Sequence, residues 1–544
     1  MSAAAAQVRA LPAAAAPASI LRWFPSLRDA AWLMPVLFLF LRLKGAGYLL
    51  GDGDTGWHLR TGEWILQNGR VPSTDLFSFT RPGEPWFAWE WLWDLCFGWL
   101  HLNFGLGAVQ VTSLALICAT IYLVYRESAR LSGNYFLAFG TAFLTAAGST
   151  IHWLARPHLF TLLFTAVSVI LLNRAAEGRL RLLAWLPLLT VVWVNFHGGF
   201  FVLWTLLLAH LAAAGLNAFL DRRPLIQSVQ PWALALAGCV AASFVNPYGW
   251  RLHRHIFGYL SDSYHREKIQ EFLSISFHNP AAVYFAAMLL LAGMTVLWAL
   301  ERRRFADALI LMGWGWLALY AARNIPIFLI CAAPLAALAV RERLERLAAS
   351  ESRLAAPVRA VFEAHREFSL LEAPARVVWL PALALSALAL LLAAPASSGP
   401  LRNQYDPKSY PENALPAVRS LGPEVRLFAD DEWGDFLLYR LWPERRVFID
   451  GRSDFYGEKL GEDMGRVLQA RHDWADILAR YQIGAVLLRA ESPLASVLKL
   501  HAGWRLLHDD GVALLFLSVS PATRGPAAAE TVNAVPHPEK STTR

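Results

Sequence analysis

The chain is long, strongly apolar and poor in charge, which excludes an ordinary soluble protein. It has 544 residues, of which 56% are hydrophobic and 17% are charged, whereas soluble domains carry about 25% charged residues. The formal net charge of +7 comes from arginine clusters between apolar blocks, and no basic patch with interleaved aromatic residues indicates a nucleic-acid partner. The four cysteines have neither metal-ligand nor disulfide spacing. The composition therefore predicts a polytopic α-helical membrane protein.

Eleven apolar segments, each close to the length that crosses a bilayer, are predicted as membrane spans. Their approximate ranges are 30–50, 106–125, 134–150, 157–173, 182–195, 200–218, 231–246, 281–299, 306–321, 325–340 and 377–394. An Ala-rich lead, residues 1–29, precedes them without a clear signal-peptide cleavage site and is expected in the cytoplasm. Arginine clusters such as Arg302 to Arg304 fall on one side of the spans, and the positive-inside rule makes that side cytoplasmic. We therefore expect the N-terminus inside and the C-terminal segment outside.

The first span is followed at once by Gly-Asp-Gly-Asp-Thr-Gly-Trp-His, residues 51–58. Ionisable groups such as Asp52, Asp54 and His58 are costly at a membrane boundary unless they do chemistry or find partners. In an extended segment the two carboxylates point to the same side. There they would suit a divalent cation such as Mg²⁺ or Mn²⁺, or one of them would suit a general base. A polar loop that merely leaves the bilayer is the alternative interpretation.

The rest of the first external loop, residues 51–104, is predicted to lie along the membrane surface. The stretch from Thr55 to Asn68 is predicted as a helix that ends at Gly69, and its tryptophans suit the membrane interface. Further along, Glu90 and Asp94 are four residues apart and would share one face of a helix. We interpret that pair as a solvated stripe.

Other polar residues of the external side lie at the ends of spans rather than in long loops. The ones that we select as candidate substrate-binding residues are Arg156, His158, Asn195, His197, Arg323 and Asn324. Each could simply cap a helix at the interface. Their concentration on one membrane face, however, predicts the lining of a single cavity.

From about residue 400 the long apolar segments stop, and a small periplasmic α/β domain is predicted over residues 399–518. EVRLFA, RRVFID and IGAVLLR are predicted as strands, GWRLLHDD and GVALLFLSV as a final hairpin, and DEWGDFLLYRL and residues 457–481 as helices. Residues 519–544 have the composition of a disordered tail. A second long external loop, residues 247–280, is expected to be functional or to be a surface flap.

The first external loop also resembles a known family. Residues 52–94 read D-x-D-x-x-W-H-L-R, then N-G-R-V-P-S-T-D, then a Trp-rich run. This pattern resembles the corresponding loop of oligosaccharyltransferase catalytic subunits, and the chain also looks like bacterial membrane proteins of the same GT-C class of glycosyltransferases. The class has a second acidic motif near the third-to-fourth span connection, where this chain has Arg156 and His158. The sequon-binding motif of the oligosaccharyltransferases is likewise not matched at residues 430–435.

The resemblance implies a GT-C-like transmembrane domain over residues 30–398, in the inner membrane of a bacterium. It further implies transfer of a sugar from a polyprenyl-phosphate-linked donor, in contact with membrane lipids, to a periplasmic lipid, glycan or protein acceptor. Asp52, Asp54 and His58 inherit the catalytic candidacy, and Asp52 and Asp54 also the candidacy as ligands of a divalent cation. Two other functions stay open. One is a transporter or flippase for a lipid-linked sugar, and the other is a non-catalytic protein of envelope assembly.

Overall fold

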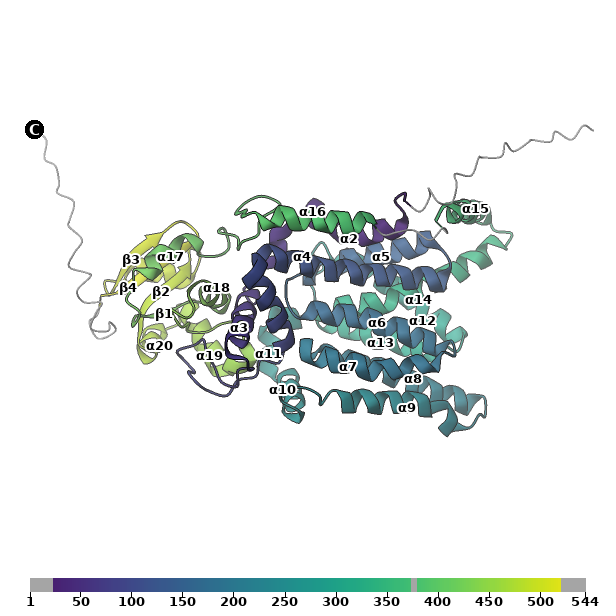
Figure 1. Cartoon of the computed structure of the whole chain (residues 1–544), viewed down its shortest axis with the longest axis horizontal. Helices are drawn as coiled ribbons and strands as arrows, with labels where there is room; N and C mark the ends of the chain where they lie inside the picture. Colours follow the sequence, from purple (N-terminus) through teal and green to yellow (C-terminus); the bar gives the residue numbers. More distant parts are fainter. Residues whose placement is uncertain (1–22, 373–378, 520–544) are drawn as a thin grey trace, which may run out of the picture.

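The computed structural model describes residues 23–372 and 379–519. A bundle of roughly parallel helices makes up one part of the molecule, and a smaller part that contains a sheet lies at one end of the bundle (Figure 1). Most of the predicted lead, residues 1–29, and nearly all of the predicted tail, residues 519–544, lie outside the described residues. The two parts together agree with the predicted class of polytopic helical protein with a small C-terminal sheet.

Each of the eleven predicted spans overlaps a helix of the bundle. These helices are α2 (Leu27–Leu41), α4 (Trp91–Ser132), α5 (Tyr135–Ser149), α6 (His158–Ala176), α7 (Trp185–Phe196), α8 (Phe201–Leu220), α9 (Leu225–Ala242), α12 (Ala282–Glu301), α13 (Phe305–Tyr320), α14 (Ile325–Ala348) and α16 (Trp379–Ala393). Among the described residues, six helices are long and apolar enough to cross a membrane. The span count of eleven and the orientation therefore stay predictions. Helix α14 forms the centre of the bundle, and every residue from Ile325 to Ala339 is buried.

Two boundaries differ from the predicted spans. The first apolar segment is interrupted after Leu41, and its last residues form the separate 3-10 helix η1 (Ala46–Leu50). Gly45 has a φ of 108° there, which a helix does not allow. Helix α4 begins at Trp91, well before the predicted span, and bends at Gly105, where φ is 72°. Its first turns therefore belong to the external loop, and the span follows the bend.

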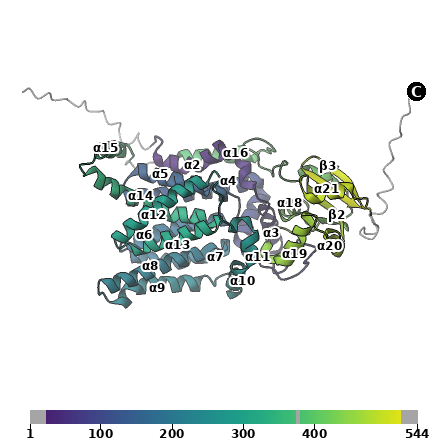
Figure 2. The ribbon, with the colours of Figure 1, turned by 180° about the vertical axis from the view of Figure 1, so that it is seen from behind.

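Several short helices lie between the bundle and the sheet-containing part (Figures 1 and 2). They are α3 (Thr55–Asn68), α10 (Trp250–Ser261), α11 (Ser263–Lys268), η5 (Gln270–Phe272), α18 (Asp431–Leu441) and α19 (Ser453–Leu468). The prediction of α3 is confirmed, including its end at Gly69, which adopts the left-handed conformation with a φ of 63°. This layer brings the first external loop, the loop 247–280 and the C-terminal residues together.

The C-terminal part contains a four-stranded mixed sheet in the order β1-β2-β4-β3. Its strands are β1 (Arg426–Phe428), β2 (Ile483–Arg489), β3 (Trp504–Asp509) and β4 (Ala513–Ser518), and its other helices are α17 (Leu415–Arg419), α20 (Trp474–Arg480) and α21 (Pro493–Leu500). Strands β1 and β2 are parallel, and the other pairs are antiparallel. The predicted strands EVRLFA and IGAVLLR and the final hairpin are confirmed.

The predicted strand RRVFID is wrong. Val447 does not join the sheet but makes an isolated bridge with Ser78 of the first external loop. Its amide donates to the carbonyl of Phe77, and its carbonyl accepts from the amide of Phe79, both at 3.0 Å. This segment therefore docks on the external loop. A short apolar run does not show whether it is buried in a sheet or against a segment far away in the sequence.

Candidate functional site

A cavity of about 350 Å³ lies where the helical bundle meets the short helices that separate it from the sheet-containing part. Six of the residues singled out from the sequence line it, and they are His58, Arg156, His158, His197, Arg323 and Asn324. The remaining polar lining includes Glu90, His152, Arg266 and Glu271, together with threonine and tyrosine hydroxyls, and aromatic side chains such as Trp89 and Trp314 supply an apolar wall. Residues that are up to 266 positions apart thus meet in one place, as the clustering of polar span ends predicts.

Asp52 and Asp54 are not part of the cavity lining but contact one of its arginines. Arg156 lies 2.9 Å from Asp52 and is also ion-paired with Asp54. The amide of Asp54 donates to the Asp52 carboxylate at 2.8 Å, which fixes the turn before α3. Arg156 thereby connects both carboxylates to the cavity.

Asp54 also lies against the C-terminal part of the chain. A methyl group on Gly451 would come within 1.9 Å of a carboxylate oxygen of Asp54, so only glycine allows this approach. Asp435 of α18 hydrogen-bonds to Asp54 and accepts from the amide of Gly451 at 2.8 Å. Burial raises the pKa of Asp54 to about 7 despite the opposing effect of Arg156. Burial and the charge of Asp54 raise the pKa of Asp435 well above its usual range, so Asp435 is the member of the pair that holds a proton.

His58 is buried and held by a second carboxylate. Its Nδ1 lies 2.6 Å from the carboxylate of Asp94, and its ring stacks on Trp57 with centroids 3.6 Å apart. Burial and the charge of Arg156 lower the pKa of His58 well below its usual range, so the imidazole is neutral at pH 7. This contact fixes the ring orientation at the cavity wall.

The interpretation of Glu90 and Asp94 as a solvated stripe is wrong. Glu90 is 6% exposed and Asp94 is 0% exposed, because the first turns of α4 pack closely on α3. At this crossing a methyl group on Gly62 would lie 1.8 Å from the Asp94 carbonyl oxygen. Burial and the charge of Asp454 raise the pKa of Glu90 well above its usual range, so it lines the cavity as a neutral acid.

His197 presents a defined hydrogen-bond donor. Its Nδ1 accepts from the amide of Gly199 at 3.0 Å and lies 2.8 Å from the hydroxyl of Thr161, which itself accepts from the indole of Trp193. Burial and Arg323 lower the pKa of His197 to about 3. A neutral imidazole whose Nδ1 is an acceptor carries its proton on Nε2. Nε2 is therefore a donor at pH 7.

Arg323, on the 3-10 helix η6 (Ala322–Asn324), faces the cavity from the bundle side. It lies 3.4 Å from Glu271 and over the ring of Phe272, 4.4 Å from the centroid. One of its terminal nitrogens is buried without a hydrogen-bond partner among the described residues. Burial alone would raise the pKa of Glu271, but Arg323 and Arg156 lower it to about 2. The nitrogen without a hydrogen bond is Nη1, the one that lies 3.4 Å from Glu271, so this side of the cavity holds a pair of opposite charges.

Asn195 is not brought to the cavity. Its amide donates at 2.8 Å to the carbonyls of Val191 and Val245, and its oxygen accepts from the indole of Trp91. It thus ties helices together at the end of α7. Sequence reasoning, in turn, did not select Asp94, Glu271 and Asp435, whose partners lie far away in the chain.

A groove of about 790 Å³ lies between residues 264–270 and helix α19. Its lining includes Asp450, the chain neighbour of Gly451, and Gly451 approaches Asp54 closely. The groove carries charges of both signs, from Lys268, Arg466 and Arg471 and from Asp431, Asp450 and Glu462. Asp54 thus contacts Arg156 of the cavity lining and Gly451 next to the groove lining.

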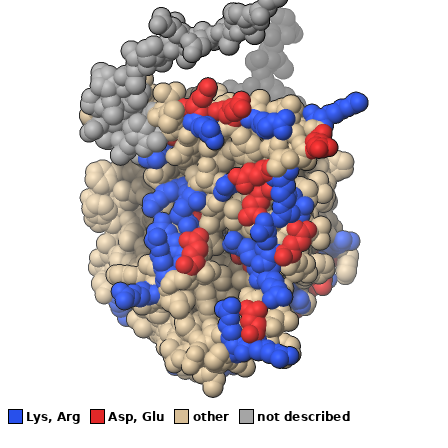
Figure 3. All heavy atoms as spheres, turned by 90° about the vertical axis from the view of Figure 1, so that its right-hand side faces the viewer, with Lys and Arg blue, Asp and Glu red and all other residues tan. Residues whose placement is uncertain are grey.

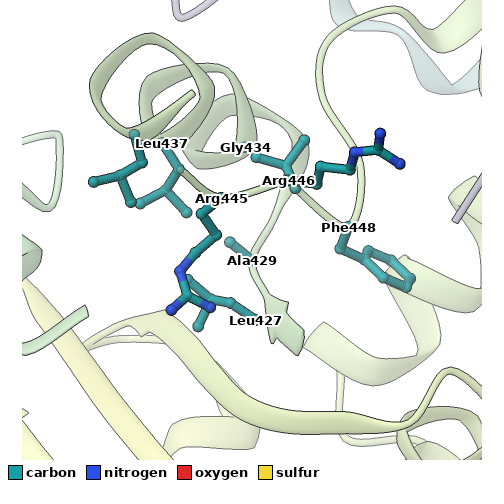
Figure 4. Close-up of a pocket in the computed structure, with 9 residues that line it drawn as sticks. Leu427, Ala429, Gly434, Leu437, Arg445, Arg446 and Phe448 are labelled. Atoms are coloured by element: carbon teal, nitrogen blue, oxygen red, sulfur yellow. The ribbon is translucent and has the colours of Figure 1, made fainter. Parts of the chain in front are cut away.

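A much smaller pocket lies beneath α18, next to residues 445–448 (Figure 4). Its volume of about 10 Å³ is room for no more than one water molecule. The guanidinium of Arg445 donates to the carbonyls of Leu421, Gly422 and Val425. This pocket is part of the packing of the C-terminal region.

The arrangement as a whole is similar to solved structures of membrane glycosyltransferases. The complex of the archaeal oligosaccharyltransferase AglB from Archaeoglobus fulgidus with an inhibitory peptide and a dolichol-phosphate aligns with a TM-score of 0.53 at 12% identity, over 90% of this chain and 74% of AglB. The same enzyme with zinc and sulfate aligns with a TM-score of 0.50 at 12% identity, over 91% and 73%. ArnT from Cupriavidus metallidurans aligns with a TM-score of 0.47 at 12% identity, over 91% of this chain and all of ArnT.

No family model matches the sequence, and neither does any curated protein. At 12% identity these alignments show that the chain shares the fold of AglB over about 90% of its length.

The residues around Asp52 and Asp54 are a poor donor set for the divalent cation that the sequence suggested. Both carboxylates are already paired with Arg156. Within residues 23–372 and 379–519 no group of three or more His, Cys, Asp or Glu side chains is arranged to hold a metal ion. A hard cation takes six or more oxygen ligands, several of them carboxylates. The guanidinium supplies the positive charge that a cation would otherwise bring.

Proposed function

We propose that this protein is a membrane glycosyltransferase that moves a sugar from a polyprenyl-phosphate-linked donor to an acceptor hydroxyl on the periplasmic side. The observation that carries the proposal is the surroundings of Asp54, a carboxylate with a pKa of about 7 that is paired with Arg156 of the cavity lining and lies against Gly451 next to the groove lining. The fold shared with AglB, which was solved with a dolichol-phosphate and a peptide, supports this assignment.

The cavity suits the donor phosphate. Arg323 lines it with its Nη1 3.4 Å from Glu271, and guanidinium groups bind phosphate oxygens through paired hydrogen bonds. His197 adds an Nε2–H donor. Because the histidines His58, His152 and His197 have lowered pKa values, they act at neutral pH as hydrogen-bonding groups rather than as cations. The apolar wall with Trp314 leads towards the bundle, where a lipid tail would lie.

The groove suits the acceptor, and Asp54 suits the role of general base. Deprotonated Asp54 takes the proton of the acceptor hydroxyl while the oxygen attacks the anomeric carbon. The bond from this carbon to the phosphate oxygen breaks, and the polyprenyl phosphate leaves with the electron pair. Arg156 orients Asp54, and Asp52 balances the charge of the guanidinium.

We further propose the topology that the arginine distribution favours, with the site on the periplasmic side of the inner membrane of a bacterium. In this arrangement residues 30–398 form the transmembrane domain, and residues 399–518 form a periplasmic domain that covers the acceptor groove. Eleven spans with the N-terminus inside place both external loops, 51–104 and 247–280, on the same side as this domain.

Replacement of single carboxylates tests the proposal. The full-length protein in membranes is incubated with radiolabelled polyprenyl-phosphate sugars, and release of the sugar is measured. Asp54→Asn is expected to lower the rate by about 10²–10⁴, which is the usual contribution of a general base, and Asp52→Asn by less. Full activity of both variants at normal expression would refute the assignment. Movement of intact donor across the membrane without release would indicate a transporter.

A further inference from the structure

A second polar cavity lies at the opposite end of the bundle from the candidate site. Its volume is about 390 Å³, and its lining includes Arg28 of α2, Tyr125, Arg126 and Arg130 of α4, and Tyr135 of α5. It lies where α2 and α5 begin and where α4 ends. Lys and Arg side chains gather on this end face of the molecule (Figure 3). No part of the proposed transfer reaction uses this cavity.

Two of its arginines carry unbalanced charge. Arg130 is paired with Glu127 at 2.7 Å and with Glu177 at 2.8 Å. In contrast, Arg28 and Arg126 make no ion pair and no side-chain hydrogen bond within the part of the chain that the structure describes. Two guanidinium groups at one cavity are therefore available to an anion.

A buried hydroxyl points to the same ligand. Tyr125 is 2% exposed, yet its hydroxyl finds no hydrogen-bond partner among the described residues. Buried polar groups are nearly always paired, so such a group calls for a partner from outside the chain. Both Arg28 and Glu372, at the end of α15 (Ala355–Glu372), act electrostatically on Tyr125. Arg28 favours an anion beside this hydroxyl, and Glu372 opposes one.

We propose that this cavity binds a phosphate group, with Arg28 and Arg126 as paired donors and the Tyr125 hydroxyl as an additional donor. Guanidinium groups match phosphate oxygens in geometry and charge. A phospholipid headgroup and free phosphate share this chemistry. With the predicted topology the cavity opens at the cytoplasmic surface of the membrane, where anionic headgroups attract clustered arginines.

The experiment uses the full-length protein purified in detergent. Short-chain phosphatidylglycerol is titrated and bound lipid is counted by native mass spectrometry, and inorganic phosphate is titrated in a separate arm with a thermal-shift readout. The double variant Arg28→Ala, Arg126→Ala is expected to weaken binding at least tenfold, and Tyr125→Phe to weaken it less. Arg181→Ala is the matched control, because Arg181 is exposed at a connection between helices and lies outside the cavity.

Binding of phosphatidylglycerol that the double variant loses and Arg181→Ala keeps supports a lipid headgroup as the ligand. The same pattern with inorganic phosphate supports a free anion. If neither probe binds saturably, or if the double variant binds both as the unmodified protein does, the proposal is overturned. Sugar release measured on the same preparations separates this result from the proposed function, since no residue of this cavity lies near Asp54.

Discussion

Asp54 and Asp435 form a carboxylate pair in which burial and mutual repulsion keep one proton. Two carboxyl groups in contact cannot both ionise at little cost, so one of the two pKa values rises strongly. Asp435 holds the proton because it lies deeper and is 2% exposed, and it donates its hydrogen bond to Asp54. This hydrogen bond stabilises the charged form of Asp54 and leaves it poised to accept a proton near pH 7.

The pH dependence of sugar transfer follows from this pair. A general base works only when deprotonated, and the pKa of Asp54 is raised to about 7. The rate is therefore expected to be highest above pH 7 and to fall about tenfold per pH unit well below it. Asp435→Asn should keep this profile, because the amide donates the same hydrogen bond. Asp435→Ala removes the donor and should shift the profile to higher pH. Identical profiles for Asp435→Ala and the unmodified enzyme would contradict the assignment.

Arg156 occupies the position between Asp52 and Asp54 that a cation would need. We therefore expect EDTA to leave transfer by the unmodified enzyme unchanged. Arg156→Gln should lower the rate by about 10²–10³, as removal of one electrostatic donor does, and should free both carboxylates. Any activity that remains is then expected to depend on added Mn²⁺, measured with the same sugar-release assay. If the unmodified enzyme loses activity in EDTA and a divalent cation restores it, Arg156 does not take the place of a cation.

Residues of the candidate site could be selected from the sequence where an ionisable side chain stands at the end of a predicted span. His58, Arg156 and Arg323 stand beside long apolar segments, and the cost of charge at a membrane boundary makes them conspicuous. Asp94, Glu271 and Asp435 were not found, because their function comes from partners elsewhere in the chain. Asp94, for example, becomes a partner of His58 only through the packing of α4 on α3, and a spacing of four residues suits a solvated face equally well.

At the scale of elements, a buried cluster of Arg452, Asp75 and Asp450 connects the first external loop to the beginning of α19. Arg452 lies 2.7 Å from both Asp75 and Asp450, with side chains at most 1% exposed. Its guanidinium also lies over the ring of Trp86, 4.5 Å from the centroid. Since α19 forms one wall of the groove, this cluster sets the distance between the groove and Asp54.

Breaking this cluster should destabilise the fold strongly. Asp75→Ala leaves a buried guanidinium short of one partner, and loss of one member of a buried ion pair costs about 3–5 kcal/mol. The free energy of unfolding, measured by denaturant titration in detergent, should fall by that amount. Glu84→Gln is the control, because it removes an ion pair with Arg81 whose side chains are 34% and 50% exposed, and exposed pairs contribute about 0–1 kcal/mol. If Asp75→Ala and Glu84→Gln lower the free energy of unfolding equally, the buried cluster does not stabilise the fold in this way.

Elements were predictable where the local sequence decides their limits. Gly69 ends α3 as predicted, whereas Asp54 at its start makes no capping hydrogen bond with its side chain. The segment RRVFID fails for the opposite reason. Its three consecutive apolar residues are buried, but the segment docks on Phe77 and Phe79 of the external loop, and no local pattern distinguishes that burial from a place in a sheet.

At the scale of the whole molecule, the two ends differ in charge and in chemistry. The end that carries the sheet holds the cavity, the groove and their carboxylates, whereas the arginine-rich connections gather at the other end (Figure 3). Basic residues are retained on the cytoplasmic side of a membrane. The separation of the two sets along the bundle supports a single orientation, although the short segments α7 and α13 would each invert the orientation of every later segment if they did not cross.

Thiol labelling of intact cells tests this orientation. In a background without the exposed Cys96, a cysteine replaces either Lys408, an exposed residue of the C-terminal part, or Arg223, an exposed residue between α8 and α9. A membrane-impermeant maleimide is expected to label Lys408→Cys in cells with a permeabilised outer membrane, and Arg223→Cys only after lysis. An odd number of predicted spans separates the two positions, so they must lie on opposite sides of the membrane. Labelling of Arg223→Cys in intact cells, or protection of Lys408→Cys, would place the candidate site on the cytoplasmic side and exclude a periplasmic acceptor.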